Sequence, residues 1–195
     1  MPDLSHILPK LVLASQSVAR KAILTQLGIE VQVKSTGCDE SHSLSDPGQT
    51  VTMLSNRKLE AYRTMHPIYE LPVLCCDTLI FFEQQLIGKP ADRSEAYTQL
   101  ASFSGKVQEV YSGWALWYEN RVYSSSDKAL VHFKVLDHET IEAYLDTLEW
   151  QGAAGAYRIQ GKGRDLIASI EGDEATVIGL PLLQISEILT APLSV

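Results

Sequence analysis

Asp77 is the residue of this sequence whose surroundings point most strongly to chemistry. It lies in the middle of residues 73–80, an apolar segment that reads VLCCDTLI. Burying a carboxylate without a cation or hydrogen-bond donors is costly in free energy. We therefore expect Asp77 to coordinate a metal, to meet a cation or to end a strand in a cleft. The competing interpretation is a strand end or bulge that exposes the carboxylate, or backbone donors that satisfy it.

Glu40 and Lys89 are further candidates. Asp39 and Glu40 follow a predicted strand, and such a pair can give hard oxygen ligands to magnesium or manganese. Lys89 lies between Gly88 and Pro90 in a predicted turn, from which its ammonium could return to the Asp77 strand and contact phosphate. Each pattern taken alone also suits a solvated loop or a surface turn.

Ser15 and Arg20 belong to a predicted strand-to-helix turn, residues 13–21, which reads LASQSVARK. Backbone N–H groups and hydroxyls at the start of a helix bind phosphate well, and Arg20 or Lys21 could add a charge-assisted contact. An ordinary helix cap beside solvated basic residues would give the same pattern.

Gln160 lies in a segment of small residues, 154–161, which reads AGAYRIQG. Small residues allow a ligand to approach closely, and the amide of Gln160 offers the donor and the acceptor that suit a base edge. A strand whose glycines only serve bends is the alternative. Cys75 and Cys76 lie in an apolar strand, so we expect buried thiols with a raised pKa, not nucleophiles.

The spacing of apolar and polar residues predicts an α/β protein with a mixed sheet. The predicted strands are residues 11–14, 30–35, 71–82, 85–87, 107–118 and 121–134. The predicted helices are residues 17–28, 50–65, 93–103 and 138–148, with a last one beginning at Pro181 and a turn at residues 46–48.

Composition limits the class of protein. The 195 residues, 45% hydrophobic and 21% charged, suit one domain, residues 1–195, or two tightly joined lobes. A net charge of -8 disfavours broad binding to nucleic acid but permits a small phosphorylated substrate. Three cysteines, an odd number, indicate reduced thiols in a cytoplasmic protein. No targeting leader or membrane span is expected from the sequence.

Taken in order, these segments resemble the Maf family of nucleotide pyrophosphatases from about Leu11 to Leu189. The family's opening Leu-Ala-Ser-x-Ser-Pro-Arg-Arg is similar to residues 13–20, and its Asp-Glu, Asp-Thr and Lys-Pro elements appear at residues 39–40, 77–78 and 89–90. A helical lysine of the family resembles Lys58, and residues 154–161 and 178–181 complete the pattern.

The resemblance implies a mixed, twisted sheet with flanking helices, and two lobes around a nucleotide-binding cleft of the Maf and ITPase kind. It also implies hydrolysis of nucleoside triphosphates to monophosphate and pyrophosphate, with Mg²⁺, Mn²⁺ or Co²⁺, often in a homodimer. The Asp-Thr and Tyr-x-Ile-Gln-Gly elements resemble the branch acting on dTTP and UTP.

The resemblance also implies roles for single residues. Asp77, Glu40 and Lys89 would be catalytic, and Glu40 and Asp77 would hold the metal. Four side chains would bind phosphates: Ser15, Arg20, Lys58 and Lys89. Thr78 and Gln160 would lie near the base.

Val18 and Ala19 depart from the family pattern, because they replace its Pro and first Arg. Loss of a guanidinium leaves two alternatives open. One is a regulatory protein linked to cell division that binds nucleotides with little hydrolysis. The other is an enzyme whose substrates are purine or modified nucleotides.

Overall fold

The computed structural model describes residues 4–41 and 46–191. Residues 1–3, which belong to the N-terminal segment where no targeting leader was expected, lie outside these ranges. In this part of the chain the strands are β1 (Lys10–Leu13), β2 (Glu30–Val33), β3 (Val73–Phe82), β4 (Gln85–Ile87), β5 (Val107–Tyr118), β6 (Arg121–Phe133) and β7 (Ile167–Glu171). The helices are α1 (Leu4–Ile7), α2 (Val18–Gln26), α3 (Pro47–Met65), α4 (Arg93–Phe103), α5 (His138–Leu145), α6 (Glu174–Ile178) and α7 (Leu182–Thr190). Two 3-10 helices are η1 (Ala154–Ala156) and η2 (Lys162–Leu166).

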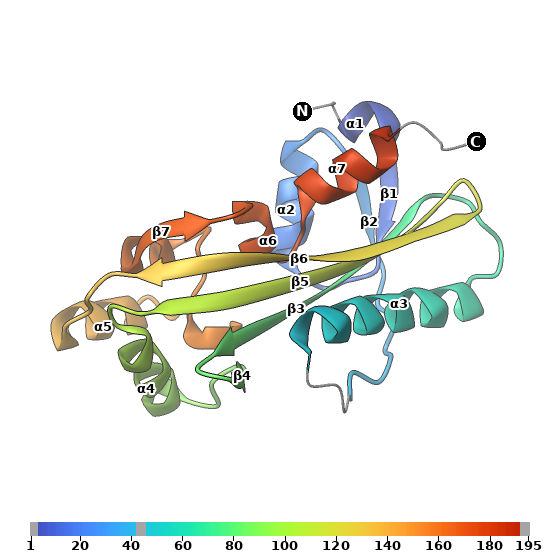
Figure 1. Ribbon diagram of the computed structural model, residues 1–195. Helices are drawn as coiled ribbons and strands as arrows, with labels where there is room; N and C mark the ends of the chain where they lie inside the picture. Colours follow the sequence, from blue (N-terminus) through green and yellow to red (C-terminus); the bar gives the residue numbers. More distant parts are fainter. Residues whose placement is uncertain (1–3, 42–45, 192–195) are drawn as a thin grey trace. The chain divides into compact units, whose positions relative to one another are not determined.

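One seven-stranded sheet joins the described strands in the order β2-β1-β3-β5-β6-β7, with β4 beside β3 (Figure 1). β1 pairs in parallel with both β2 and β3, whereas β4 runs antiparallel to β3 and β7 antiparallel to β6. The mixed α/β sheet expected from the sequence is therefore confirmed. None of the helices in residues 4–41 and 46–191 has the length and apolar character needed to cross a membrane.

The chain divides into two compact units. Unit 1 comprises residues 1–78, 112–127 and 179–195, and unit 2 comprises residues 79–111 and 128–178. β3, β5 and β6 each contribute residues to both units, so neither unit is one continuous stretch of chain. The two units have separate cores.

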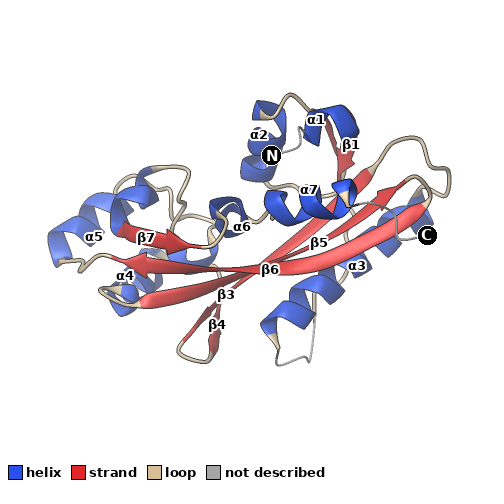
Figure 2. Ribbon diagram, turned by 45° about the horizontal axis from the view of Figure 1, so that its top comes forward, coloured by secondary structure: helices blue, strands red, loops and turns tan. Residues whose placement is uncertain are grey.

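Unit 1 has two cores, one on each face of its strands. Successive strand residues point to opposite faces. Leu11 and Leu13 therefore pack with α1, α2 and α7, whereas Val12 and Ala14 pack with α3. The same alternation divides residues 73–76 of β3 and 114–117 of β5 between the two cores. Figure 2 shows the three helices on one side of these strands and α3 on the other.

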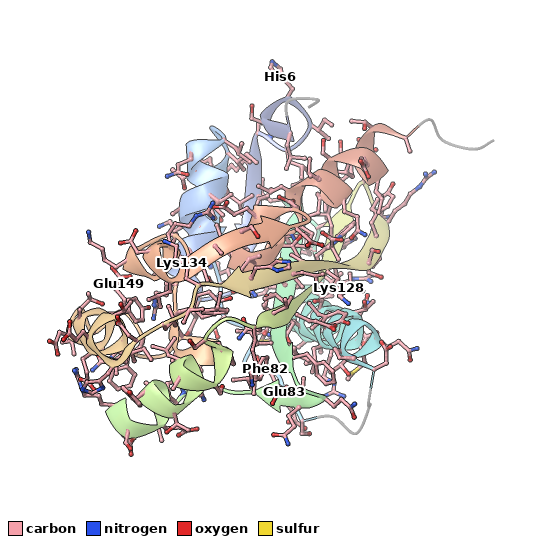
Figure 3. The ribbon with its side chains drawn as sticks, turned by 60° about the vertical axis from the view of Figure 1, so that its left-hand side comes forward. His6, Phe82, Glu83, Lys128, Lys134 and Glu149 are labelled. Atoms are coloured by element: carbon pink, nitrogen blue, oxygen red, sulfur yellow. The ribbon has the colours of Figure 1, made fainter. Side chains whose placement is uncertain are left out.

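Unit 2 packs α4 and α5 against the remaining parts of the strands. Phe82, Phe103 and Phe133 meet in this core, with ring centroids 4.9 and 5.2 Å apart along the series. Phe82 ends β3, and Glu83 beside it begins the turn into β4 (Figure 3). Glu83 and Gln84 both have positive φ, 47° and 64°, which is the geometry that a two-residue hairpin turn requires.

Several predicted boundaries are corrected by the structure. Residues 46–48, expected to form a turn, begin α3 instead: Asp46 caps the helix by accepting from the Gln49 N–H at 2.6 Å, and Pro47 takes the first turn. β2 was expected to be half-buried, but three of its four residues are exposed. α5 ends at Leu145 instead of residue 148: Asp146 is its C-cap, and Leu148 has a positive φ of 61°, which is not helical. α1 and α6 have too few turns to give a sequence signal.

Candidate functional site

Asp77 forms an ion pair with Lys58, and Lys58 also reaches Glu40. The ammonium donates to Asp77 Oδ1, and its nitrogen lies 2.9 Å from Glu40 Oε1. Asp77 and Lys58 are 7% and 9% exposed, whereas Glu40 lies at the surface. Of the three alternatives expected for a buried Asp77 (a metal, a cation or a strand end in a cleft), the structure shows a contact with a cation, and the cation is Lys58.

The periodicity of two elements brings this pair together. On β3, Val73 and Cys75 face α3, so Asp77 faces it too. On α3, Lys58 lies one helical turn from the buried Leu54 and Tyr62, so it shares their inward stripe. Because each side chain occupies a core-facing position, the two charges meet with little solvent between them.

The charges around Lys58 do not cancel. Burial by itself would lower the pKa of Lys58, but the attraction of Asp77 and then of Glu40 outweighs burial and raises it. Lys58 is therefore a cation near neutral pH. Two carboxylates and one ammonium leave a formal charge of about -1, which favours the approach of a further cation.

The carboxylates of Asp77 and Glu40 fit a divalent cation. Both approach one ammonium, so their oxygens border the same small region. Mg²⁺ is usually held by one or two carboxylates together with substrate phosphates and water, instead of by an all-protein cage. Across residues 4–41 and 46–191, no group of three or more His, Cys, Asp or Glu side chains could hold a metal. A divalent cation held here would therefore have two protein carboxylates, those of Asp77 and Glu40.

Arg20 is the centre of a second polar cluster in unit 1. Its Nη1 donates to Ser15 Oγ at 2.9 Å and to the Cys76 carbonyl at 3.0 Å. Its Nη2 donates to Thr78 Oγ1 at 2.9 Å, and its Nε donates to the Gly179 carbonyl at 2.8 Å. These four bonds use four of the five N–H groups of a guanidinium. Arg20 therefore fixes both hydroxyls, and one N–H is left outside this set of contacts.

Gly179 can only be glycine in this arrangement. Its φ is +102°, and a Cβ there would lie 2.7 Å from Thr78 Oγ1 and 2.9 Å from Arg20 Nε. Thr78 Oγ1 is also 2.9 Å from Ser112 Oγ. Neither Gly179 nor Ser112 was singled out as a site residue by the sequence. Gly179 stood inside a matched motif, but Ser112 had no local signal.

Ser15 is held from two directions. Its Oγ accepts from the Ser17 N–H at 3.3 Å as well as from Arg20, so the hydroxyl hydrogen of Ser15 stays outside these two bonds. Ser17 is the N-cap of α2 and accepts from the Arg20 N–H at 3.3 Å. The strand-to-helix turn expected from the sequence is therefore present, and it orients Ser15 beside the start of α2.

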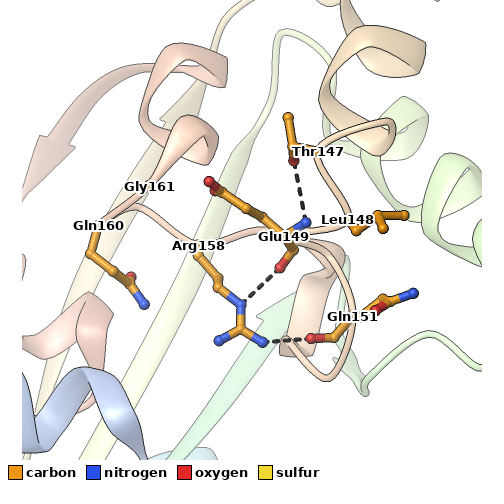
Figure 4. A pocket seen from close by; sticks show the side chains of 7 residues that line it. All are labelled: Thr147, Leu148, Glu149, Gln151, Arg158, Gln160 and Gly161. Atoms are coloured by element: carbon orange, nitrogen blue, oxygen red, sulfur yellow. Dashed lines mark hydrogen bonds between the residues drawn. The ribbon is translucent and has the colours of Figure 1, made fainter.

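Lys89 and Gln160 belong to unit 2, whereas the other six candidate residues belong to unit 1. Lys89 is exposed after β4, and the carbonyl of its neighbour Gly88 accepts from the Gly155 N–H at 3.1 Å. Gln160 is also exposed and lines a surface pocket of about 530 Å³ (Figure 4). Within unit 2, the Lys89 turn is thus tied to the segment of small residues that precedes Gln160.

Cys75 and Cys76 are fully buried core thiols, as expected. Burial raises the pKa of both, and that of Cys76 reaches about 11. Neither thiol can serve as a nucleophile near neutral pH.

The described residues thus form a mixed-sheet α/β protein in which Lys58 lies between two carboxylates and Arg20 holds a serine and a threonine. The chain belongs to the Maf-like protein family, whose pattern matches residues 10–191.

Relatives of known name cover almost the whole chain. A dTTP/UTP pyrophosphatase of Latilactobacillus sakei is 38% identical over 179 residues, 91% of this chain and 98% of that protein. A dTTP/UTP pyrophosphatase of Symbiobacterium thermophilum is 38% identical over 182 residues, 93% of each chain. A third protein of that name, from Pyrococcus furiosus, is 31% identical over 180 residues, 92% of this chain and 94% of the relative.

One solved structure is a more distant neighbour, a nucleoside-triphosphatase (dITP/XTP pyrophosphatase) of Mycobacterium abscessus. It has a TM-score of 0.39 and 10% identity, and covers 65% of this chain and 75% of its own. A likeness of this size carries no argument about function.

Proposed function

We propose that this protein hydrolyses nucleoside triphosphates to monophosphate and pyrophosphate, with pyrimidine nucleotides such as dTTP and UTP, or modified nucleotides, as substrates. The observation that carries the proposal is the buried Asp77–Lys58 pair with Glu40 at its surface side. The names of the relatives support the same reaction. A water oxygen forms a bond to phosphorus, the bridging P–O bond between the α- and β-phosphates breaks, and pyrophosphate leaves.

Asp77 is the general base in this proposal. Lys58 occupies Asp77 Oδ1, which leaves Oδ2 to orient a water and accept its proton. Lys58 fixes the direction in which the Asp77 carboxylate points. The N–H group of Lys58 that faces neither carboxylate can donate to a phosphate oxygen.

Glu40 and Asp77 would hold a divalent cation, Mg²⁺, Mn²⁺ or Co²⁺. When bound, such a cation neutralises charge on phosphate oxygens and makes a nearby water more acidic. Lys89 is the third catalytic residue of the proposal, a compact positive charge that can contact phosphate.

The other candidates bind substrate in this proposal. Ser15 donates its free hydroxyl hydrogen to a phosphate, and Arg20 adds its fifth N–H while holding Ser15 in place. Thr78 and Gln160 lie near the base, and the amide of Gln160 can both donate to and accept from a pyrimidine edge.

The wider setting is part of the same proposal: a cytoplasmic homodimer of one Maf-like domain per chain, without nucleic acid or membrane as a partner. A net charge of -8 disfavours a nucleic-acid backbone as a partner and permits a small phosphorylated substrate. Three free thiols, two of them buried, suit a reducing compartment.

The test is pyrophosphate release from a panel of canonical and modified triphosphates with Mg²⁺, Mn²⁺ or Co²⁺. Replacing Asp77 by Asn keeps an oxygen for Lys58 but removes the base, so turnover should fall about 10³-fold, within the range for a lost general base. Asp165→Asn, the same change at an exposed position, is the matched control and should leave turnover unchanged. Turnover by Asp77→Asn at the level of the unmodified protein would refute the assigned role.

Ala19 favours a second candidate, a nucleotide-binding regulatory protein linked to cell division with little hydrolysis. It replaces a family arginine, and the adjacent Arg20 already spends four N–H groups on the protein. Calorimetry separates the two functions: tight nucleotide binding beside negligible pyrophosphate release supports the regulator.

A further inference from the structure

Glu149 holds the loop that carries Gln160. Its Oε2 accepts from the Lys162 N–H at 2.7 Å, a charge-assisted bond to the backbone. Gly161 lies directly under the same carboxylate, because a Cβ at Gly161 would be 2.3 Å from Glu149 Oε2. The carboxylate thus rests on the backbone immediately after Gln160.

The backbone of Glu149 is itself fixed. Its N–H donates to Thr147 Oγ1 at 3.2 Å, and its carbonyl accepts from Arg158 Nε at 2.8 Å. Arg158 also donates to the carbonyl of Gln151, so one guanidinium ties both sides of this turn (Figure 4). The carboxylate therefore extends from a well-supported segment, and its bond to Lys162 can hold the loop in one place.

Gln160 lies between two anchored neighbours. On one side Ile159 is 5% exposed and belongs to the core of unit 2. On the other side Gly161 and Lys162 rest against Glu149. Gln160 itself is exposed and lines the pocket of about 530 Å³. With both flanking positions fixed, the backbone of Gln160 is fixed as well, and with it the direction of the bond from Cα to Cβ.

We propose that Glu149 is a positioning residue for base binding: its carboxylate fixes residues 160–162 so that the Gln160 amide is presented in one orientation to a pyrimidine base. The inference rests on the proposed function, which places Gln160 near the base. It goes further by making base affinity depend on a carboxylate whose contacts in the structure are with the backbone of the loop.

The first experiment needs no activity. Hydrogen exchange of the Lys162 amide is measured in the unmodified protein, in Glu149→Ala and in Glu149→Gln. The alanine removes the acceptor, so this amide should exchange at least tenfold faster, while amides of the core strands keep their rates. The glutamine keeps an oxygen at the same length and should restore most of the protection. Unchanged exchange in Glu149→Ala overturns the proposal.

The second experiment is a double-mutant cycle in KM for UTP and dTTP. Glu149→Ala should raise KM about tenfold, the size of one lost hydrogen bond, with kcat within about twofold. In a Gln160→Ala background the same change should alter KM less than twofold, because the amide to be positioned is gone. Equal effects in both backgrounds mean that Glu149 acts only on the fold, and they overturn the proposal.

Gly161→Ala is an independent variant. Gly161 has a φ of -126°, which any residue can adopt, so the main obstacle to alanine is the Glu149 carboxylate. Gly161→Ala should push that carboxylate away and reproduce the KM of Glu149→Ala. The combination of both changes should be no worse than Glu149→Ala alone, and an additive loss counts against the proposal.

Failure of the proposed function gives a different result. If the unmodified protein releases no pyrophosphate from any triphosphate, the reaction is wrong, and base affinity is then measured by calorimetry with the same variants. If pyrophosphate is released but the cycle is additive, the reaction stands and the role of Glu149 is wrong.

Discussion

Lys58 serves two carboxylates with one ammonium, and its removal would leave Asp77 charged and buried without its cation. Lys58→Met should therefore destabilise the protein by about 3–5 kcal/mol in urea unfolding. The combination Lys58→Met with Asp77→Asn should recover much of this loss, because no buried charge remains. Lys162→Met, at an exposed lysine, is the control and should change stability by less than about 0.5 kcal/mol. A loss that is the same with and without the Asp77 charge would contradict this account.

The three cysteines should differ in reactivity. Cys75 and Cys76 have no exposed surface and a raised pKa, so at pH 8 they lack both access and thiolate, whereas Cys38 is partly exposed. Alkylation of the folded protein, read by mass spectrometry, should modify Cys38 first and alone. In denaturant all three should react. Rapid labelling of Cys75 under native conditions would show that β3 opens readily.

At the scale of single residues, the sequence indicated Asp77 as a functional candidate but did not indicate Lys58 as its partner. An acid among apolar residues is conspicuous by itself, because its burial needs an explanation. Lys58 stands in an amphipathic helix where a lysine is ordinary, and only the resemblance to the Maf family selected it. The four bonds of Arg20 join segments up to 159 positions apart, and no local pattern encodes such contacts.

At the scale of elements, Gly113 sets how closely α3 approaches β5. A Cβ at this position would lie 2.3 Å from the backbone carbon and oxygen of Val51. Gly113→Ala should therefore push α3 outward and cost about 1–3 kcal/mol, visible as a lower Tm. Gly88→Ala is the control, since its Cβ would meet nothing within 4 Å. Equal Tm values for the two variants would mean that α3 adjusts freely.

The same displacement should weaken activity, because α3 carries Lys58 and β3 carries Asp77. We expect Gly113→Ala to lower kcat for pyrophosphate release more than it raises KM. The measurement is made at a temperature where the variant is fully folded. A change confined to KM would show that α3 matters for binding and not for the base.

Long elements were predictable and their ends were not. α4 has the bounds that the sequence predicted, since Asp92 and Ser104 flank a complete periodic pattern. α3 was given a late start because Asp46-Pro47-Gly48 resembles a turn, yet the same residues form a cap and a first turn. Residues 154–156 form a 3-10 turn with positive φ at Gly155 and Ala156, which neither helical nor strand periodicity can indicate.

At the scale of the whole molecule, the carboxylates of Asp77 and Glu40 predict a dependence on divalent metal. EDTA should abolish pyrophosphate release, and Mg²⁺, Mn²⁺ or Co²⁺ should restore it. Glu40→Gln should need about 10–100-fold more metal for half-maximal rate, as expected when a ligand is weakened. Glu60→Gln, at an exposed position of α3, is the control. Full activity in EDTA would remove the metal from the proposal.

The division into two units has a consequence for biosynthesis. Unit 2 ends at Ile178, whereas unit 1 needs Gly179, whose carbonyl accepts from Arg20, and α7, which covers one of its cores. All residues of unit 2 have therefore left the ribosome once residue 178 has emerged, whereas unit 1 still lacks Gly179 and α7 at that point. Messages truncated near the 3′ end would yield a protein that lacks the Gly179 carbonyl for Arg20 and the helix that covers one core of unit 1.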